Sequence, residues 1–220
     1  TSPERIRGYE FLLPPIAEQK IISDILSKIE AKIELNKKAS ETLEEIAKAL
    51  FKSWFIDFDP VRAKAEGRST GLPDEISDLF PDSFEDSELG EIPSPWRIYS
   101  LKELSSYLSR GISPKYCDQG EGVRVVNQKC IRDCMIDFSK ARYHDPLLKK
   151  IDGREIQKFD CLINSTGVGT LGRVAITPEI EESVIVDSHV TVVRGKNIEQ
   201  SLFLTMLLLQ RQGEIESLGE

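Results

Sequence analysis

The fold of this chain is decided by residues 16–55, which read IAEQKIISDILSKIEAKIELNKKASETLEEIAKALFKSWF. The stretch contains neither glycine nor proline, the two residues that most often interrupt a helix. At about 1.5 Å per residue, a helix over this stretch would be nearly 60 Å long. Such helices are uncommon inside small domains. The stretch therefore predicts a spacer or docking rod, whose function depends on distance and partners.

The apolar residues of this stretch recur every seven positions, as they do in coiled coils. A single apolar stripe on so long a helix cannot be buried against the helix itself, so we expect a second helix to cover it. Seven residues form the predicted pairing surface: Ile22, Ile25, Ile29, Asn36, Leu43, Ile46 and Leu50. Asn36 either fixes the register of the pair or is simply an exposed gap in the seam.

The rest of the chain divides by composition. Residues 1–15 read as an extended piece stopped by Pro14-Pro15, and residues 16–56 form the helix. Residues 57–95 form an acidic, proline-rich connector, and residues 96–220 alternate short β-rich runs with glycine and proline. The predicted fold class is α+β, with a long coiled-coil-type helix and a globular domain that holds a mixed, twisted β-sheet.

Local patterns predict individual elements within residues 96–220. The expected strands are Val123–Val126, Cys161–Asn164, Arg173–Ile176, Val184–Val186 and Val190–Val193. The expected helices are Leu101–Leu108 and Gln200–Gln210.

The formal net charge of −8 is concentrated in one segment. Residues 55–95 carry eleven acidic and three basic side chains, whereas the segments on either side carry equal numbers of each. Either flanking segment is therefore able to present a basic face, and the overall charge does not exclude a nucleic-acid partner.

The four cysteines are irregularly spaced, which favours free thiols in a reducing cytoplasm. Cys130 and Cys134 lack a second pair of ligands, so we expect no metal site. No apolar run is long enough for a membrane span, and the N-terminus lacks a signal-peptide pattern, so we expect a cytoplasmic location with no membrane contact.

The sequence Gly167-Val168-Gly169-Thr170-Leu171-Gly172 matches the pattern of a dinucleotide-binding loop. That fold requires a helix to follow, but residues 173–176 read as a strand, so we reject the cofactor interpretation. A glycine-rich turn between two strands remains. Such a turn either serves structure alone or brings Asn164, Ser165, Thr166 and Thr170 to a phosphate backbone.

Catalytic chemistry has little support in the sequence. Asp57 and Asp59 form a carboxylate pair, but Pro60 and the neighbouring apolar residues favour an anchoring role. A nuclease motif, a Walker lysine and a nucleophile beside His144 or His189 are all missing. We therefore expect no catalytic residues and no cofactor.

Arginine, asparagine and glutamine can make paired hydrogen bonds to base edges, while lysine holds phosphates. Eight candidates of this kind precede the glycine-rich turn: Arg110, Lys115, Tyr116, Arg124, Asn127, Gln128, Lys129 and Arg132. With Ser165, Thr166 and Thr170 they form the predicted DNA-binding set. For each of them, a solvated surface role is the alternative.

Several segments together resemble the specificity subunits of type I restriction–modification systems. Residues 12–22 (LLPPIAEQKII) look like the end of a target-recognition domain and the start of a conserved helix, and residues 50–61 (LFKSWFIDFDPV) look like the end of that helix. Residues 71–96 are similar to the connector into the next target-recognition domain. Residues 159–176 resemble the central strands of that domain more loosely.

The resemblance implies a non-catalytic subunit that recognises double-stranded DNA. In this family, two target-recognition domains lie at opposite ends of an antiparallel helix pair and each reads one half of a split target. Methyltransferase and restriction subunits join the assembly and bring AdoMet, ATP and Mg²⁺. This chain shows one helix, one recognition domain and only the closing segment of another (residues 1–15), so we expect a half-subunit or a fragment, with a recognition domain incomplete at its C-terminus.

Two copies, or this chain and another specificity half, are then expected to pair through the long helix. Residues 1–15 of each copy would complete the other's domain. The main alternative is a coiled-coil assembly protein with no DNA contact, and a third is a nuclease or methyltransferase in its own right.

Overall fold

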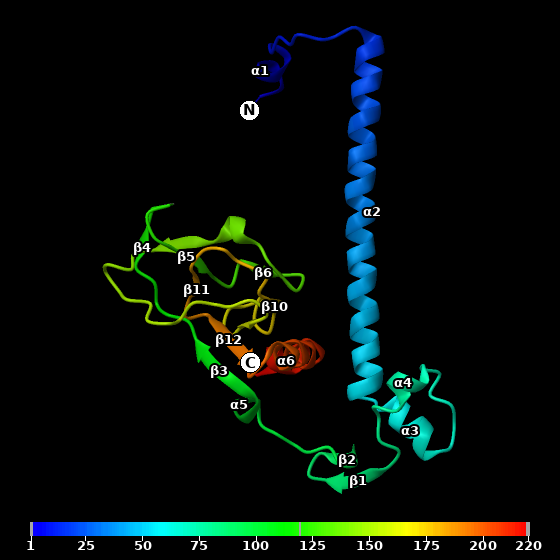
Figure 1. The fold of residues 1–220 in the computed structure, drawn as a ribbon. Coiled ribbons are helices and arrows are strands. Elements are labelled where there is room, and N and C mark those ends of the chain that lie inside the picture. The colour runs from blue at the N-terminus through cyan, green and yellow to red at the C-terminus, as the bar shows by residue number, and fades with distance from the viewer. Residues whose placement is uncertain (1, 119, 219–220) are drawn as a thin grey trace. The chain divides into compact units, whose positions relative to one another are not determined.

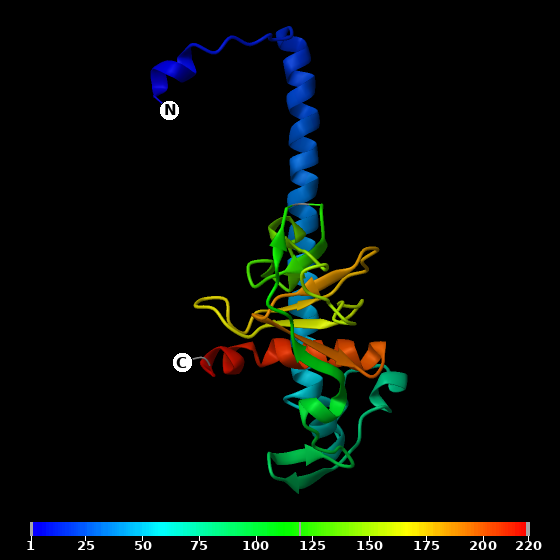
Figure 2. The same cartoon turned by 90° about the vertical axis from the view of Figure 1, so that its left-hand side faces the viewer.

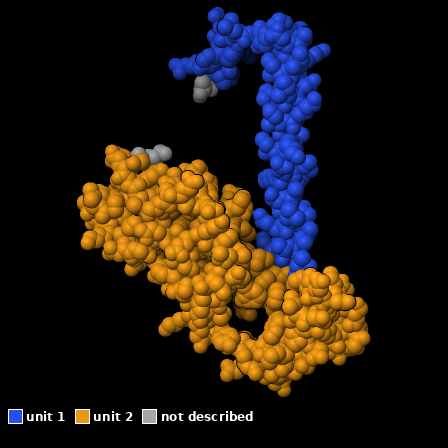
Figure 3. Space-filling view, in the orientation of Figure 1, with its two compact units in different colours: residues 1–50 blue, residues 51–220 orange. Residues whose placement is uncertain are grey.

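The structure is a computed structural model that describes residues 2–118 and 120–218 (Figure 1). It contains two compact units, residues 1–50 and residues 51–220 (Figure 3). Helices and β-sheets occur in separate parts of the chain, which confirms the α+β class. No helix of the described residues is long and apolar enough to cross a membrane.

The first unit contains the helix α1 (Pro3–Arg7) and most of α2 (Ile16–Phe55). The prediction that residues 1–15 are wholly extended was wrong at α1. Pro3 occupies the first turn, where a helix does not need the N–H that proline lacks. Glu4 in the first turn and Arg7 in the last complement the helix dipole.

Helix α2 is one continuous element of 40 residues, visible as an unbroken rod in Figure 1, and its N-terminal half is also clear in Figure 2. Its large aliphatic side chains are about half exposed or more: Ile22, Ile25, Leu26, Ile29, Ile33, Leu43, Ile46 and Leu50. Ion pairs one turn apart, Lys38 with Glu34 and Lys37 with Glu41, lie on the exposed surface and contribute only a few tenths of a kcal/mol each. The stripe predicted from the heptads is thus present on the helix, and its partner stays a prediction.

The C-terminal end of α2 enters an aromatic cluster in the second unit. Phe51, which is 7% exposed, and Phe55 both lie within about 5 Å, centroid to centroid, of the ring of Phe203. The ring of Phe55 also stacks on Trp96, and Trp54 meets Phe80 edge-on. Aromatic pairs of this kind add about 0.5–1.5 kcal/mol each beyond the area they bury, so Phe51, Trp54 and Phe55 pack as part of the second unit.

The connector that the sequence suggested is largely structured. It contains the helices α3 (Asp59–Ala65) and α4 (Asp74–Ser77) and a hairpin of β1 (Phe84–Ser87) and β2 (Gly90–Pro93). Val61 is fully buried and Phe80 is 6% exposed, and the Lys64 ammonium group donates to the carbonyl of Phe80 at 2.6 Å. These contacts hold the parts of the acidic segment together.

Two four-stranded sheets form the rest of the second unit. The first has the order β10 (Val174–Ile176), β9 (Cys161–Asn164), β12 (Val190–Gly195) and β3 (Ser105–Arg110), with all neighbours antiparallel. The second has the order β11 (Val184–Val186), β5 (Val123–Val126), β8 (Arg142–His144) and β4 (Tyr116–Cys117). It is mixed, because β11 runs parallel to β5. A small hairpin pairs β6 (Ile131–Arg132) with β7 (Met135–Ile136), and the 3-10 helix η1 (Phe138–Lys140) follows.

The main core contains buried aliphatic residues of both sheets, among them Val126, Leu162, Val186 and Val192. A second cluster lies between the first sheet and three helices, α5 (Leu101–Leu104), α6 (Ile198–Gln210) and α7 (Gln212–Ser217). Cys130 and Cys161 are buried and all four cysteines are free, as predicted. Burial raises the pKa of the Cys161 thiol to about 12.

The expected helix Leu101–Leu108 was wrong beyond Leu104. Ser100 and Glu103 form a capping box that starts α5, but the chain turns into β3 at Ser105. There the backbone pairs with β12, with Leu108 opposite Val193, and this tertiary pairing overrides local helix preference. The expected strands and the helix near residues 200–210 are confirmed within a few residues at their ends.

Candidate nucleic-acid interface

The strand registers bring several loops together at one edge of both sheets. Arg110 ends β3 and pairs with Thr191 at the start of β12, and Asn164 ends β9 opposite Val190. In the second sheet β5 and β11 end side by side, with Val126 opposite Val186. The turn from Asp187 to His189 joins β11 to β12 and links the two sheets at this edge. Residues that border these strands therefore meet, although they are far apart in sequence.

The glycine-rich turn lies at this edge, between the antiparallel strands β9 and β10. Asn164, which is fully buried, donates from Nδ2 to the carbonyls of Thr170 and Gln128, both at 3.0 Å. It thereby joins the turn to the loop after β5. A Cβ on Gly167 would lie 2.4 Å from Gln128 Oε1, so only glycine fits there, at φ +106°. The prediction of a turn between two strands is confirmed.

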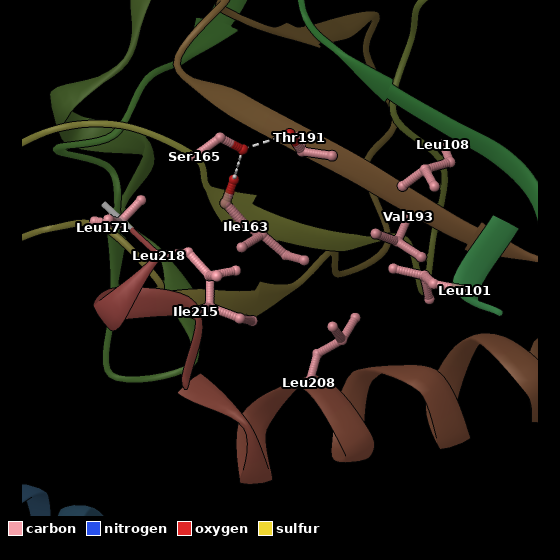
Figure 4. Close-up of a pocket in the computed structure, with 10 residues that line it drawn as sticks. All are labelled: Leu101, Leu108, Ile163, Ser165, Leu171, Thr191, Val193, Leu208, Ile215 and Leu218. Carbon is pink, nitrogen blue, oxygen red and sulfur yellow. Dashed lines mark hydrogen bonds between the residues drawn. The ribbon is translucent and has the colours of Figure 1, made fainter. Parts of the chain in front are cut away.

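Ser165 and Arg110 connect the turn to β3. The Arg110 guanidinium donates to the Ser165 carbonyl at 3.2 Å. The Ser165 hydroxyl is held internally by the Ile163 carbonyl and the Thr191 hydroxyl, as the dashed lines of Figure 4 show. Arg110 is therefore exposed yet oriented, whereas the Ser165 hydroxyl is not free to bind a ligand.

Thr166 and His189 form a second contact across the edge. The Thr166 hydroxyl lies 2.5 Å from His189 Nδ1. The His189 backbone N–H donates to Asp187 Oδ1 at 2.9 Å. Burial raises the pKa of the Asp187 carboxyl, which is 4% exposed. Arg173, at the far side of the turn, donates to the carbonyl of Gly169 at 2.8 Å.

Arg142 begins β8 beside the end of β5, where it pairs with Val125. Its guanidinium lies over the ring of Tyr116, 3.2 Å from the centroid. Partial burial, and then the charge of Asp187, raise the pKa of the Tyr116 hydroxyl, so Tyr116 is a neutral platform at physiological pH. The ring thereby holds the Arg142 guanidinium in place by a cation–π contact.

Six residues at this edge carry polar groups that are at least partly exposed, and together they are termed the strand-end rim: Arg110, Lys129, Arg142, Thr166, Arg173 and His189. Four of them are arginine or lysine and carry a positive charge. The turn that joins β11 to β12 contains one carboxylate, that of Asp187, and it is buried. Glu216 of α7 lies beside the glycine-rich turn and places a carboxylate on that side. The rim has the chemistry to bind phosphates and base edges.

The other predicted DNA-binding residues lie outside the strand-end rim or have their polar groups engaged by the fold. Arg124 forms an ion pair with Glu182 at 2.8 Å, and Arg132 lies 3.5 Å from Asp133 on the β6–β7 hairpin. Lys115 lies at the other end of β8, where its N–H donates to buried His144. Asn127 is 9% exposed, and its amide bonds the backbone of Lys129 and of Lys140. Thr170 bonds the Gly167 carbonyl.

Of the eleven predicted residues, the structure brings six together at this edge: Arg110, Gln128, Lys129, Ser165, Thr166 and Thr170. Tyr116 contacts this edge through Arg142.

Sequence reasoning missed Arg142, Arg173 and His189. Arg173 and His189 border predicted strands that follow a turn, so an antiparallel arrangement of those strands would have placed them beside Ser165 and Thr166. Arg142 gave no such signal, because β8 has only three residues and was not predicted.

An apolar pocket of about 330 Å³ lies close to the rim, between the first sheet and the helices α6 and α7 (Figure 4). Leu208 and Ile215 face Ile163 and Val193 across it, and Leu101 lies beside Val193. Its lining has no charged side chain, and its two hydroxyls, of Ser165 and Thr191, pair with each other. It is therefore unsuited to hold a nucleotide. Among residues 2–118 and 120–218, no cluster of three or more histidine, cysteine or acidic side chains is placed to bind a metal.

Comparison with known proteins gives one consistent result. Residues 2–45 match the family described as Type I restriction modification DNA specificity domain. The Type I restriction enzyme HindI specificity subunit of Haemophilus influenzae is 52% identical over 67 residues, which are 30% of this chain and 15% of that protein. The MjaVIII specificity subunit of Methanocaldococcus jannaschii is 25% identical over 209 residues, 89% of this chain and 43% of that protein.

Among solved structures, the HsdS subunit from Thermoanaerobacter tengcongensis aligns with 93% of this chain and 44% of its own, at 17% identity and a TM-score of 0.44. The chain thus spans less than half the length of these relatives.

Proposed function

We propose, from the premise that this chain is a relative of the specificity subunits of type I restriction–modification systems, that it recognises one half of a split DNA target through the strand-end rim. The observation that carries the proposal is the convergence of Arg110, Arg142, Arg173 and Lys129 with Thr166 and His189 at one edge of both sheets. Cations hold the phosphate backbone, and guanidinium and imidazole groups read base edges.

The rim is suited to this task because its groups are oriented before binding. Arg110 and Thr166 are each hydrogen-bonded to a neighbouring loop, Arg173 is bonded to its own turn, and Arg142 is stacked on Tyr116. Fixing a flexible side chain on binding costs about 0.5–1.5 kcal/mol. Orientation in the free protein reduces that cost and favours one arrangement of contacts.

We assign α2 the role of a spacer. The exposed stripe through Ile22, Ile29, Leu43 and Leu50 favours antiparallel pairing with a second copy or with another specificity half. A pair of such helices, each about 60 Å long, would separate two reading domains and so set the distance between half-sites. Under this proposal residues 1–15, 16–56, 57–95 and 96–220 are the closing segment, spacer, connector and recognition domain.

The chain is proposed to be non-catalytic. Methyltransferase and restriction subunits are its proposed partners, and AdoMet, ATP and Mg²⁺ would be bound by them. No cofactor is assigned to this chain.

Salt-dependent DNA binding tests the proposal. Fluorescence anisotropy would measure the Kd of the chain, alone and with its methyltransferase subunit, for a labelled duplex at several salt concentrations. Removing one phosphate contact reduces the slope of log Kd against log salt by about 0.9. We expect Arg110→Gln and Arg173→Gln each to weaken binding and to lower the slope by about that amount.

Lys196→Gln is the matched control, because Lys196 is exposed and follows β12 at the end away from the rim. Binding that is lost equally in all three variants would place the DNA on another surface. Absence of duplex binding by the complete assembly would favour the alternative, a coiled-coil scaffold without DNA contact.

A further inference from the structure

Val168 is the most exposed large apolar side chain of the described residues, at 107% of its reference area. It lies at the tip of the glycine-rich turn, between Gly167 at φ +106° and Gly169 at φ +73°. No neighbouring side chain shelters it. Burial in the fold therefore does not explain why an apolar residue occupies this position.

Valine is also a poor choice for the local backbone. Tight turns favour glycine, asparagine, aspartate and serine, and a β-branched residue fits strands better. Positions where the sequence contradicts local preference without a structural gain are candidates for function. Val168 is such a position, and it projects from the same edge that carries Thr166 and Arg173.

The turn that presents Val168 is rigid. The N–H groups of Thr170 and Leu171 both donate to the Gly167 carbonyl, at 3.1 and 3.0 Å. The Gly172 N–H donates to the Asn164 carbonyl at 2.9 Å, and Arg173 holds the carbonyl of Gly169. Hydrogen bonds therefore hold the backbone of the turn on both sides of Val168.

The tip is also narrow. Gly167 and Gly169 have no side chains, so the two methyl groups of Val168 project alone between them. The major groove of B-DNA is about 12 Å wide and admits a helix, so it admits such a turn. An apolar side chain gains nothing from a phosphate, but in that groove it can meet the C5 methyl group of thymine.

We infer that Val168 is a specificity-determining residue that packs against the C5 methyl group of one thymine in the major groove. The inference rests on the proposed DNA-reading function of the rim. Arg173 and Thr166, on either side of the turn, would hold the flanking backbone while Val168 contacts the base.

The test compares thymine with deoxyuridine, which lacks only the methyl group. A bound site would first be selected from a random duplex pool by the chain with its methyltransferase subunit. Each thymine of that site would then be replaced singly by deoxyuridine, and Kd measured for the unmodified protein and for Val168→Ala. We expect one position at which deoxyuridine weakens binding about fourfold, the effect of one buried methyl-sized group. In Val168→Ala this difference should disappear.

Leu147→Ala is the matched control, because Leu147 is 94% exposed and lies in the loop after His144, at the opposite end of the second sheet. It should leave the full deoxyuridine profile unchanged. A Val168→Ala protein that keeps the deoxyuridine effect, or a site with no sensitive thymine, overturns the inference but leaves the proposed function standing. Failure to select any sequence overturns both.

Discussion

Replacing Asn164 with alanine tests whether the rim depends on the buried amide that joins its loops. The Asn164 Nδ2 group donates to the carbonyls of Gln128 and Thr170, both at 3.0 Å, and the residue is fully buried. Each lost hydrogen bond removes about 0.5–1.5 kcal/mol. Thr170 keeps the N–H of Arg173 as a donor, whereas the Gln128 carbonyl loses the donor supplied by Asn164. A buried acceptor left unpaired adds about 1–3 kcal/mol, so we expect a total loss of about 2–6 kcal/mol.

Urea unfolding followed by tryptophan fluorescence measures this loss. With a denaturant slope of about 2 kcal/mol per molar, the midpoint should fall by about 1–3 M. The matched control is Asn197→Ala, the same substitution at the exposed N-cap of α6, where Oδ1 accepts the Gln200 N–H at 2.8 Å. A cap of this kind contributes about 1 kcal/mol. A midpoint shift for Asn164→Ala no larger than that of Asn197→Ala would refute the assigned role of the amide.

Three further predictions follow from other parts of the structure. Ile29→Glu puts a charge into the half-exposed stripe of α2 and should convert a dimer to a monomer, as measured by light scattering. The control Ala31→Glu, outside the stripe, should leave the dimer intact. A dimer that survives Ile29→Glu would contradict pairing through this face. Arg194→Met removes both 2.7 Å bonds to the fully buried Asp160 carboxylate and should lower the free energy of unfolding by about 3–5 kcal/mol. The control Lys158→Met breaks an exposed pair and should lower it by about 0–1 kcal/mol. Equal losses would show that burial of the pair is unimportant. Because burial raises the pKa of Asp187 above its ordinary 3.8, its contribution to stability is present below that pH and is lost as the pH rises through the folded-state pKa. Asp187→Asn should thus match the parent protein near pH 3.5 and gain stability relative to it at about pH 7, as measured by urea midpoints; a constant difference across this range would exclude titration of Asp187 as the cause.

The sequence was sufficient for elements whose signal is local. The heptads of residues 16–55 predicted α2, and the apolar runs around Val125, Leu162, Ile185 and Val192 predicted the central strands. The glycine pattern after Asn164 predicted a turn because a strand follows it. In each case the residues that carry the signal are consecutive or regularly spaced.

Elements that depend on distant pairing were not predictable in the same way. β3 replaced an expected helical turn because Leu108 pairs with Val193, more than eighty residues away. β4 and β8 are too short to show a period, and so Arg142 and its stacking on Tyr116 remained unseen. Asn164 was expected to approach a phosphate, but it is buried and holds two loops together.

The separation between the rim and the core has a practical consequence for protein engineering. The side chains of Thr166, Val168 and His189 project from turns whose backbones are fixed by other residues, chiefly Asn164, Gly167 and Asp187. A combinatorial library at these three positions leaves every buried aliphatic residue in place. Such a library can therefore be screened for new binding preferences at nearly constant folding yield, because it varies only the exposed side chains of two turns.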